Sequence, residues 1–289
     1  MTESNFAPLL LGSTGIAGQA LQKYFNSLGI EVTSVTRKTE SNSINKNLNL
    51  DLFTIPEVDI SNFTSVIYAA QSRKYKFSPP EYADLSNINV VLPTILAKKC
   101  FERNIPFVYF SSGSVYQDTE KVLTEDSPLR KADEINPYTA SKLFGESSVL
   151  SVNPMAIVFR PFYIVGNGAK KPNLIANLVE SIKSHEIIHI DGDKGMQFQP
   201  ISSLDLARAC AHLISRGATG IYNLSGPNLL HLVDVIRILG NKLKISPKIL
   251  FNNEQPRAFR VSNNKLLNSG FNYMNDVEKI LADVSLELG

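Results

Sequence analysis

Tyr138 and Lys142 have the residue types and the spacing of a proton-transfer pair. They stand four residues apart in the run Tyr-Thr-Ala-Ser-Lys, so that both side chains share one face of a helix. A lysine ammonium beside a phenol lowers the phenol's pKa and lets the tyrosine exchange a proton near neutral pH. The pair therefore predicts a general acid and base at the start of a helix, although the same spacing also occurs on ordinary surface helices.

A serine cluster follows an apolar run further upstream. Pro106–Phe110 reads as a buried strand, and the sequence SSGSVY follows it directly. In open α/β sheets ligands bind at the carboxyl edge of the strands. Ser112 is therefore placed to hydrogen-bond a carbonyl or alcohol of a substrate. The alternative is a Ser/Gly-rich turn that only ends the strand.

A glycine-rich turn lies near the amino terminus. The run GSTGIAG at 12–18 follows the apolar run Pro8–Gly12 and opens a segment with helical periodicity. Glycines permit a tight strand-to-helix turn and let a pyrophosphate approach the backbone, while the helix N-terminus offers N–H groups and a positive dipole end. In this context the pattern predicts dinucleotide binding rather than an ordinary turn.

The residue after the second expected strand bears on the choice of cofactor. NAD enzymes commonly carry an acid there for the ribose 2′-hydroxyl. This chain has Arg37 after Glu31–Thr36, and an arginine could pair with a 2′-phosphate. The sequence favours NADP over NAD on this ground, unless Arg37 is only a solvated loop charge.

The expected elements alternate between strands and helices through the first two-thirds of the chain, which is typical of βαβ units and a parallel sheet. The fold class predicted is therefore α/β, a doubly wound Rossmann fold. Residues 1–165 and 204–226 would form the dinucleotide-binding domain, and 166–203 and 227–289 a smaller discontinuous substrate-binding lobe. The strands expected are Pro8–Gly12, Glu31–Thr36, Ser65–Ala70, Pro106–Phe110, Met155–Phe159, Ile187–Ile190 and Gly220–Ser225. The helices expected are Ile16–Leu28, Asn87–Arg103, Tyr138–Leu150, Leu174–Lys183, Leu204–Ser215 and Leu230–Leu243.

Composition excludes several classes of protein. A formal net charge of +2 gives no general basic surface for nucleic acid. No apolar stretch is long enough to span a membrane, the amino terminus does not read as a signal peptide, and two cysteines fit core thiols in a cytoplasmic protein. The four histidines form no metal-binding motif, so no metal site is expected.

Taken in order, the motifs GSTGIAG, VIYAA, FSSGSVY, YTASK and FRPFYIVG resemble the extended short-chain dehydrogenase/reductases, the NAD-dependent epimerase/dehydratase family. The resemblance covers 9–166 and continues weakly to the LDLARA and YNL runs. It implies that Tyr138 is the general acid and base, that Lys142 holds the nicotinamide ribose, and that Ser112 is the third catalytic residue.

The resemblance also implies roles for further residues. The pyrophosphate would be cradled by Gly12, Thr14, Gly15, Ile16 and Gly18. Other cofactor contacts would come from Arg37, from Asp51 and Leu52 after a third strand, from Ala69 and Ala70, and from Pro161. Substrate contacts would come from Ser112, Gly113, Ser114, Tyr163 and Arg257. For Asp51 and Arg257, a solvated surface charge is a comparable alternative.

Departures from the family pattern narrow the reaction. Members that resemble sugar dehydratases carry an acidic pair where this chain has Gly113 and Ser114, so elimination of water is disfavoured. Members that resemble bifunctional epimerase-reductases place a cysteine at the second position, and Ser114 is a poor substitute in that chemistry. Tyr163 replaces the family's asparagine near the substrate phosphate, which leaves the substrate class more open.

The activity expected is hydride transfer at a keto or hydroxyl carbon of a nucleotide sugar, with a 4-ketoreductase favoured over a 4-epimerase. A reductase of a non-sugar ketone and a non-catalytic NAD(P)-binding module would also fit the fold. Loss of the tyrosine or the lysine would suit the non-catalytic module, and this chain keeps both. By analogy with the family, a homodimer could pair through Asn87–Arg103 and Tyr138–Leu150.

Overall fold

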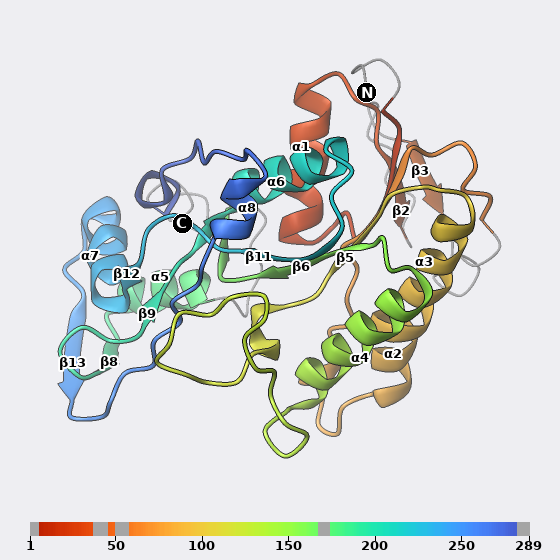
Figure 1. Cartoon of the computed structure of the whole chain (residues 1–289). Helices are drawn as coiled ribbons and strands as arrows, with labels where there is room; N and C mark the ends of the chain where they lie inside the picture. Colours follow the sequence, from red (N-terminus) through yellow and green to blue (C-terminus); the bar gives the residue numbers. More distant parts are fainter. Residues whose placement is uncertain (1–5, 37–45, 50–57, 167–173, 282–289) are drawn as a thin grey trace.

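A single parallel sheet organises the chain. The computed structural model describes residues 6–36, 46–49, 58–166 and 174–281. Seven strands, all parallel, take the order β11-β6-β5-β4-β1-β2-β3 (Figure 1). They are β1 (Pro8–Leu11), β2 (Thr33–Thr36), β3 (Lys46–Asn49), β4 (Ser65–Tyr68), β5 (Phe107–Phe110), β6 (Ile157–Pro161) and β11 (Gly220–Leu224). The strand order reverses between β1 and β4, as in a doubly wound Rossmann sheet, and the predicted fold class is confirmed.

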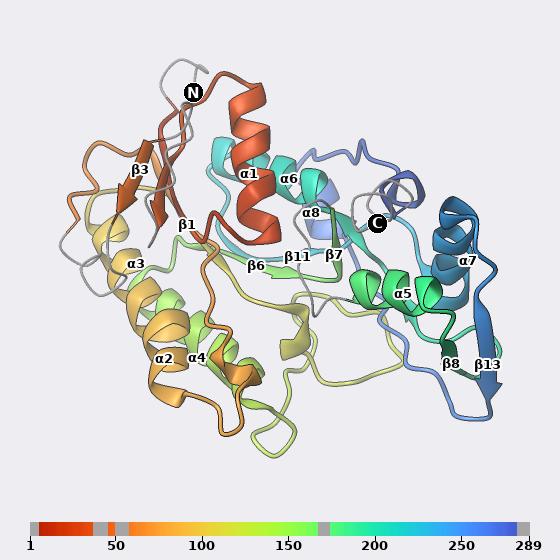
Figure 2. The ribbon, with the colours of Figure 1, turned by 180° about the vertical axis from the view of Figure 1, so that it is seen from behind.

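Successive residues of each strand face opposite layers of helices. Leu10 of β1 packs in the core with α1 (Ile16–Ser27) and α6 (Ser203–Ser215). Leu9 and Leu11 pack in a second core with α3 (Leu92–Glu102), and α4 (Pro137–Val152) covers the same face. A strand buried on both sides has no polar alternation, which explains the apolar runs of the sequence. Figure 2 shows α1 and α6 together on one side, away from α3 and α4.

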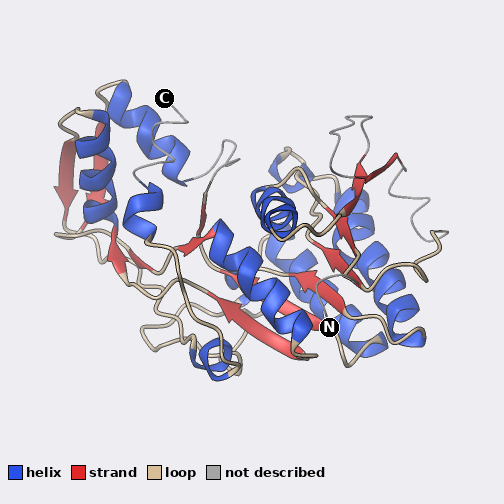
Figure 3. Cartoon of the chain, turned by 90° about the horizontal axis from the view of Figure 1, so that it is seen from above, coloured by secondary structure: helices blue, strands red, loops and turns tan. Residues whose placement is uncertain are grey.

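A smaller lobe lies beside the sheet (Figure 3). Its core joins α5 (Leu174–Lys183), α7 (Leu232–Leu243) and β8 (Ile187–Asp191). β8 pairs in parallel with β13 (Lys248–Asn252), a strand that the sequence did not suggest. The remaining short elements are β7 (Ile164–Val165), β9 (Gln197–Phe198), β10 (Ile201–Ser202), β12 (Leu230–His231), α2 (Tyr82–Ser86), α8 (Asn264–Asn268) and the 3₁₀ helices η3 (Lys74–Lys76) and η5 (Gly113–Val115).

The helix expected at Asn87–Arg103 is divided. Asn87–Val91 forms a π-helical turn, η4, between α2 and α3. Pro93 follows at the start of α3, and a proline has no N–H to donate to the carbonyl four residues earlier, here that of Asn89. The Tyr109 hydroxyl donates to this carbonyl instead, at 2.8 Å. π-Helical turns of this kind are often found at functional sites.

Gly145 on α4 makes room for that contact. A Cβ at this position would lie 2.1 Å from the Tyr109 hydroxyl oxygen and 2.4 Å from the Asn89 carbonyl oxygen. Helix α4 can therefore approach β5 and η4 only because residue 145 has no side chain.

We expect Gly145→Ala to destabilise the protein by about 1–3 kcal/mol, because overpacking outweighs the better helix propensity of alanine. The measurement is urea-induced unfolding. Phe144→Ala is the control, since Phe144 is 63% exposed and surface changes stay within about 0.5 kcal/mol. Equal stability of the two variants would contradict the packing argument.

Candidate active site

The glycine-rich turn joins the carboxyl ends of β1 and β4. Gly12 has φ +90°, and a Cβ on it would lie 2.4 Å from the backbone nitrogen of Ala70. A Cβ on Gly18 would lie 2.2 Å from the Gly12 carbonyl oxygen. These two glycines are required by the protein's own packing, and they bring Ala69 and Ala70 against the turn.

The N-terminus of α1 opens beside this turn. Gly15 is its N-cap residue and supplies no side-chain hydrogen bond, and the first turn holds no acidic residue. Thr14 is exposed, and its carbonyl accepts a hydrogen bond from Gln19. The N–H groups of the first helical turn, those of Ile16, Ala17 and Gly18, have no intrahelical partners. The turn therefore fits the pyrophosphate of a dinucleotide.

Ser112 and Ser114 lie just beyond the end of β5. Ser112 caps the short helix η5, and its Oγ accepts a hydrogen bond from the Ser114 backbone nitrogen. The two hydroxyl oxygens are 2.9 Å apart. The predicted serine therefore lies at the same edge of the sheet as the glycine-rich turn.

Tyr138 and Lys142 lie in the first two turns of α4. Asn136 caps this helix by accepting from the Thr139 backbone nitrogen at 2.9 Å. Lys142 is 1% exposed, and its Nζ donates to the Phe110 carbonyl at 2.8 Å. This bond ties α4 to the end of β5, which brings the Ser112 side chain to Tyr138.

Burial controls the proton affinity of both groups. It raises the pKa of Tyr138 to about 12, and a hydrogen bond with Ser112 opposes the rise. It lowers the pKa of Lys142 to about 7, and the charge of Glu146 opposes the fall. From the sequence, the lysine is expected to lower the tyrosine's pKa; in the structure desolvation outweighs such an effect, and Tyr138 keeps its proton at neutral pH.

Two residues beside Tyr138 were missed from the sequence. The Tyr75 ring packs on the Tyr138 ring with centroids 4.8 Å apart. The Gln71 Oε1 lies 3.4 Å from the Tyr138 hydroxyl, which donates to it. Gln71 lies three residues beyond the end of β4, and its place after the carboxyl end of a strand was the signal that could have found it.

Two of the residues that the sequence predicts as substrate contacts, Gly113 and Tyr163, have unusual surroundings or backbone geometry. A Cβ on Gly113 would lie 2.5 Å from the Phe162 ring, so that the space for a side chain at 113 is already filled. Tyr163 has φ +43°, a conformation that a bulky residue rarely adopts. Its ring packs against Phe198 and Phe259, with centroids 4.9 and 5.9 Å away.

The other predicted residues divide into two groups. Pro161 ends β6, next to β11. Arg257 is exposed and close enough to Tyr163 to lower its pKa, although burial has the larger, opposite effect. Arg37, Asp51 and Leu52 lie outside the described residues, so the structure does not place them.

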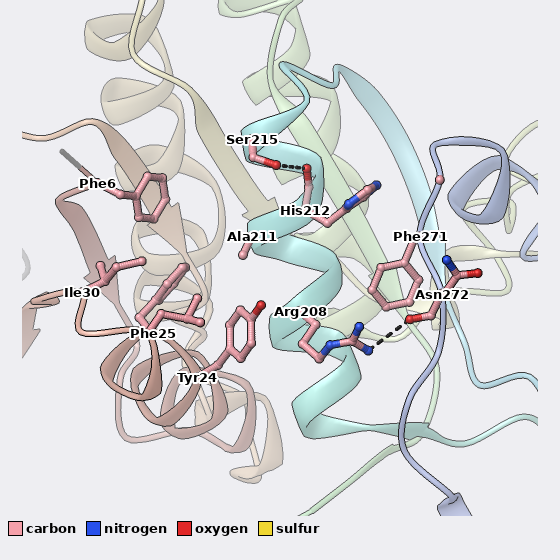
Figure 4. A pocket seen from close by; sticks show the side chains of 12 residues that line it. Phe6, Tyr24, Phe25, Ile30, Arg208, Ala211, His212, Ser215, Phe271 and Asn272 are labelled. Carbon is pink, nitrogen blue, oxygen red and sulfur yellow. Dashed lines mark hydrogen bonds between the residues drawn. The ribbon is translucent and has the colours of Figure 1, made fainter. Parts of the chain in front are cut away.

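A pocket of about 380 Å³ lies elsewhere, between α1, α6 and 270–272 (Figure 4). None of the predicted site residues lines it. Its main polar groups are bonded within the protein, Arg208 to Asp205 and the Asn272 carbonyl, and His212 to Ser269. We therefore do not assign the chemistry to this pocket.

The described parts of the chain contain neither a metal-binding cluster nor a membrane-spanning helix. No group of three or more His, Cys, Asp or Glu side chains in those parts could hold a metal ion. No helix among the described residues is long and apolar enough to cross a membrane.

The sequence profile of the NAD dependent epimerase/dehydratase family matches residues 9–225. A probable low-salt glycan biosynthesis reductase of Haloferax volcanii is 27% identical over 51% of this chain and 48% of its own length. The beta subunit of methionine adenosyltransferase 2 of Xenopus tropicalis is 28% identical over 75% and 66%, respectively. The dTDP-4-keto-6-deoxy-D-glucose reductase of Streptomyces niveus is 23% identical over 83% and 79%. The chain thus spans about half to two-thirds of the length of the first two.

Solved structures with the same fold cover nearly the whole chain. MoeE5 in complex with UDP-glucuronic acid and NAD has a TM-score of 0.81 at 20% identity, over 97% of this chain and 98% of that one. The UDP-N-acetylglucosamine 4-epimerase of Methanobrevibacter ruminantium, in complex with UDP-N-acetylmuramic acid, has a TM-score of 0.83 at 16% identity, over 98% and 97%.

Lys142 makes folding stability depend on pH. With a folded pKa near 7 and an unfolded pKa near 10.4, it destabilises the fold fully below about pH 7, and the penalty is relieved as the pH rises toward 10. We expect the stability of Lys142→Met minus that of the wild type to fall by about 2–3 kcal/mol from pH 6 to pH 9.

Urea unfolding at both pH values measures this difference. Lys98→Met on α3 is the matched control, because the Lys98 side chain is two-thirds exposed. The stability difference between Lys98→Met and the wild type should be the same at both pH values. A Lys142→Met difference that did not change with pH would contradict the buried amine.

Proposed function

Because the chain belongs to the NAD-dependent epimerase/dehydratase family, we propose that it is an NAD(P)-dependent oxidoreductase acting at a keto or hydroxyl carbon of a nucleotide sugar. We further propose that it is a 4-ketoreductase. The reductases of Haloferax and Streptomyces among its relatives support this choice. Residues 166–203 and 227–289 would bind the substrate, and the rest of the chain the cofactor.

The cofactor site is assigned to groups at the carboxyl edge of the sheet. Gly12, Gly15 and the first N–H groups of α1 would bind the pyrophosphate, and Lys142 would hold the nicotinamide ribose. NADPH or NADH, when bound, supplies the hydride. Arg37 supports NADP as the partner, because a guanidinium can bind a 2′-phosphate in bidentate fashion.

The residues of this chain then handle the substrate oxygen. Ser112 would hydrogen-bond the carbonyl oxygen and polarise it. Tyr138 would donate its phenolic proton to that oxygen as the hydride arrives at carbon. Tyr163 and Arg257, from the other side, would contact the activated sugar.

The observation that carries the reductase assignment is the presence of two reductases among the relatives, at 27% and 23% identity. Tyr138 is compatible with this assignment, because burial raises its pKa to about 12 and ketone reduction starts from the protonated phenol. The ring of Phe162 beside Gly113 further supports reduction over dehydration, because it occupies the place of an acidic side chain.

Tyr138→Phe should reduce kcat/KM about 100- to 10,000-fold, the usual contribution of a positioned acid, and leave cofactor affinity within about threefold. The assay follows NADPH consumption with dTDP-4-keto-6-deoxy-D-glucose, the substrate in the name of the Streptomyces relative. Tyr82→Phe, at a 63% exposed ring, is the matched control. Full activity of Tyr138→Phe would reject Tyr138 as the acid.

Cofactor exchange separates the reductase from the 4-epimerase. We expect purified protein to bind NADPH reversibly and more tightly than NADH in a fluorescence titration, because a reductase must replace its cofactor at every turnover. Tightly retained NAD in the purified protein would instead indicate an epimerase. No binding of NADPH, NADH, NADP or NAD would reject both.

A further inference from the structure

A buried ion pair lies one helical turn beyond Lys142. Glu146 is 4% exposed, and both its carboxylate oxygens accept hydrogen bonds from Arg160 of β6, at 3.0 Å from Nε and 2.7 Å from Nη2. Arg160 is itself 2% exposed. A bidentate pair of this kind fixes the carboxylate in one place. Neither residue takes part in the proton transfer proposed for Tyr138.

The position of Glu146 directs its charge toward Lys142. The two residues are four apart on α4 and therefore neighbours on one helix face. Lys142 reaches the end of β5 through the Phe110 carbonyl, and Glu146 reaches the adjacent strand β6 through Arg160. The carboxylate thus acts on the amine through its charge, which raises the pKa of Lys142, and not as a direct salt bridge.

Among the residues that the structure describes, the other groups found beside the Lys142 amine do not supply a negative charge. Its Nζ lies 5.3 Å from the ring centroid of Tyr109 on β5 and 5.9 Å from that of Tyr138 on α4. Both phenols are held neutral by burial, which raises their pKa values. The charge of Glu146 adds to the rise for Tyr109, so its field extends to this part of the core.

We propose that Glu146, fixed by Arg160, is a positioning residue that extends to higher pH the range in which the buried Lys142 amine is protonated, and that it thereby sets the pH range in which the protein holds its cofactor. The effect on cofactor binding rests on the proposed function, whereas the effect of Glu146 on the amine does not depend on it. A protonated amine attracts the anionic dinucleotide and donates from all three N–H bonds, and a neutral amine loses that attraction.

Paired variants that differ only at residue 142 isolate the lysine. In each background, Lys142 and Lys142→Met proteins are unfolded in urea from pH 5 to pH 10. Their stability difference begins to change at the pH where Lys142 loses its proton in the folded state. We expect this onset to move down by at least one pH unit in Glu146→Gln, and by less than half a unit in Glu146→Asp, which keeps the charge.

Two further variants provide a second test and a control. Arg160→Gln removes the positive charge that opposes the Glu146 carboxylate, and it should therefore move the onset to higher pH, opposite to Glu146→Gln. Either variant can test the proposal if the other fails to fold. Glu102→Gln, at the exposed end of α3, is the control and should leave the onset unchanged. The same onset in Glu146→Gln as in the wild type would overturn the proposal.

An NADPH fluorescence titration over the same pH range tests the effect of Glu146 on cofactor binding. The pH at which affinity has halved should fall in Glu146→Gln by the same shift as the onset. A shift of the onset without a shift of the NADPH affinity profile would overturn the role of Glu146 in cofactor binding. If neither the wild type nor any variant bound NADPH, the proposed function would fail, while the effect of Glu146 on the amine would stand.

Discussion

The hydrogen bond from the Lys142 amine to the Phe110 carbonyl, 2.8 Å long, is the contact on which the arrangement of the site depends. It joins the first turns of α4 to the last residue of β5, two elements separated by a long connection. Once it is made, Ser112 and Tyr138 must lie together, because one follows Phe110 by two residues and the other precedes Lys142 by one turn. Burial of the lysine is the cost of this placement, and it is what lowers the pKa of the amine.

The packing of α4 against β5 and η4 allows the two elements to come close enough for this hydrogen bond. Pro93 leaves the Asn89 carbonyl without its helical donor, the Tyr109 hydroxyl takes that place, and Gly145 admits both. The Asn89 side chain adds a second link, since its amide donates to the Ser141 hydroxyl at 2.8 Å and its oxygen accepts from the Ser72 backbone nitrogen. One buried asparagine therefore connects α4 with the segment after β4 that carries Gln71 and Tyr75.

The sequence was sufficient for the sheet, because buried parallel strands and the glycine turn have local signatures. It was also sufficient to name Ser112, Tyr138 and Lys142, which the structure brings to one edge of the sheet. It did not reveal β13, whose residues Lys248, Leu250 and Phe251 are exposed and so show no burial pattern. Nor did it reveal Glu146 or Gln71, because their importance comes from pairing with Arg160 and Tyr138 across the fold, at separations of 14 and 67 residues.

Tyr163 combines a departure from the family pattern with a left-handed backbone conformation. The resemblance places asparagine at this position, and asparagine tolerates the left-handed conformation better than other side chains. Tyr163 adopts this conformation, at φ +43°, although such strain costs about 1–3 kcal/mol. Packing of the tyrosine ring between Phe198 and Phe259 offsets that strain, since aromatic pairs contribute about 0.5–1.5 kcal/mol each beyond burial. The difference from the family pattern therefore exchanges a small polar side chain for an aromatic ring that is held against Phe198 and Phe259. The same packing that fixes this ring also compensates for the backbone conformation that the residue must adopt.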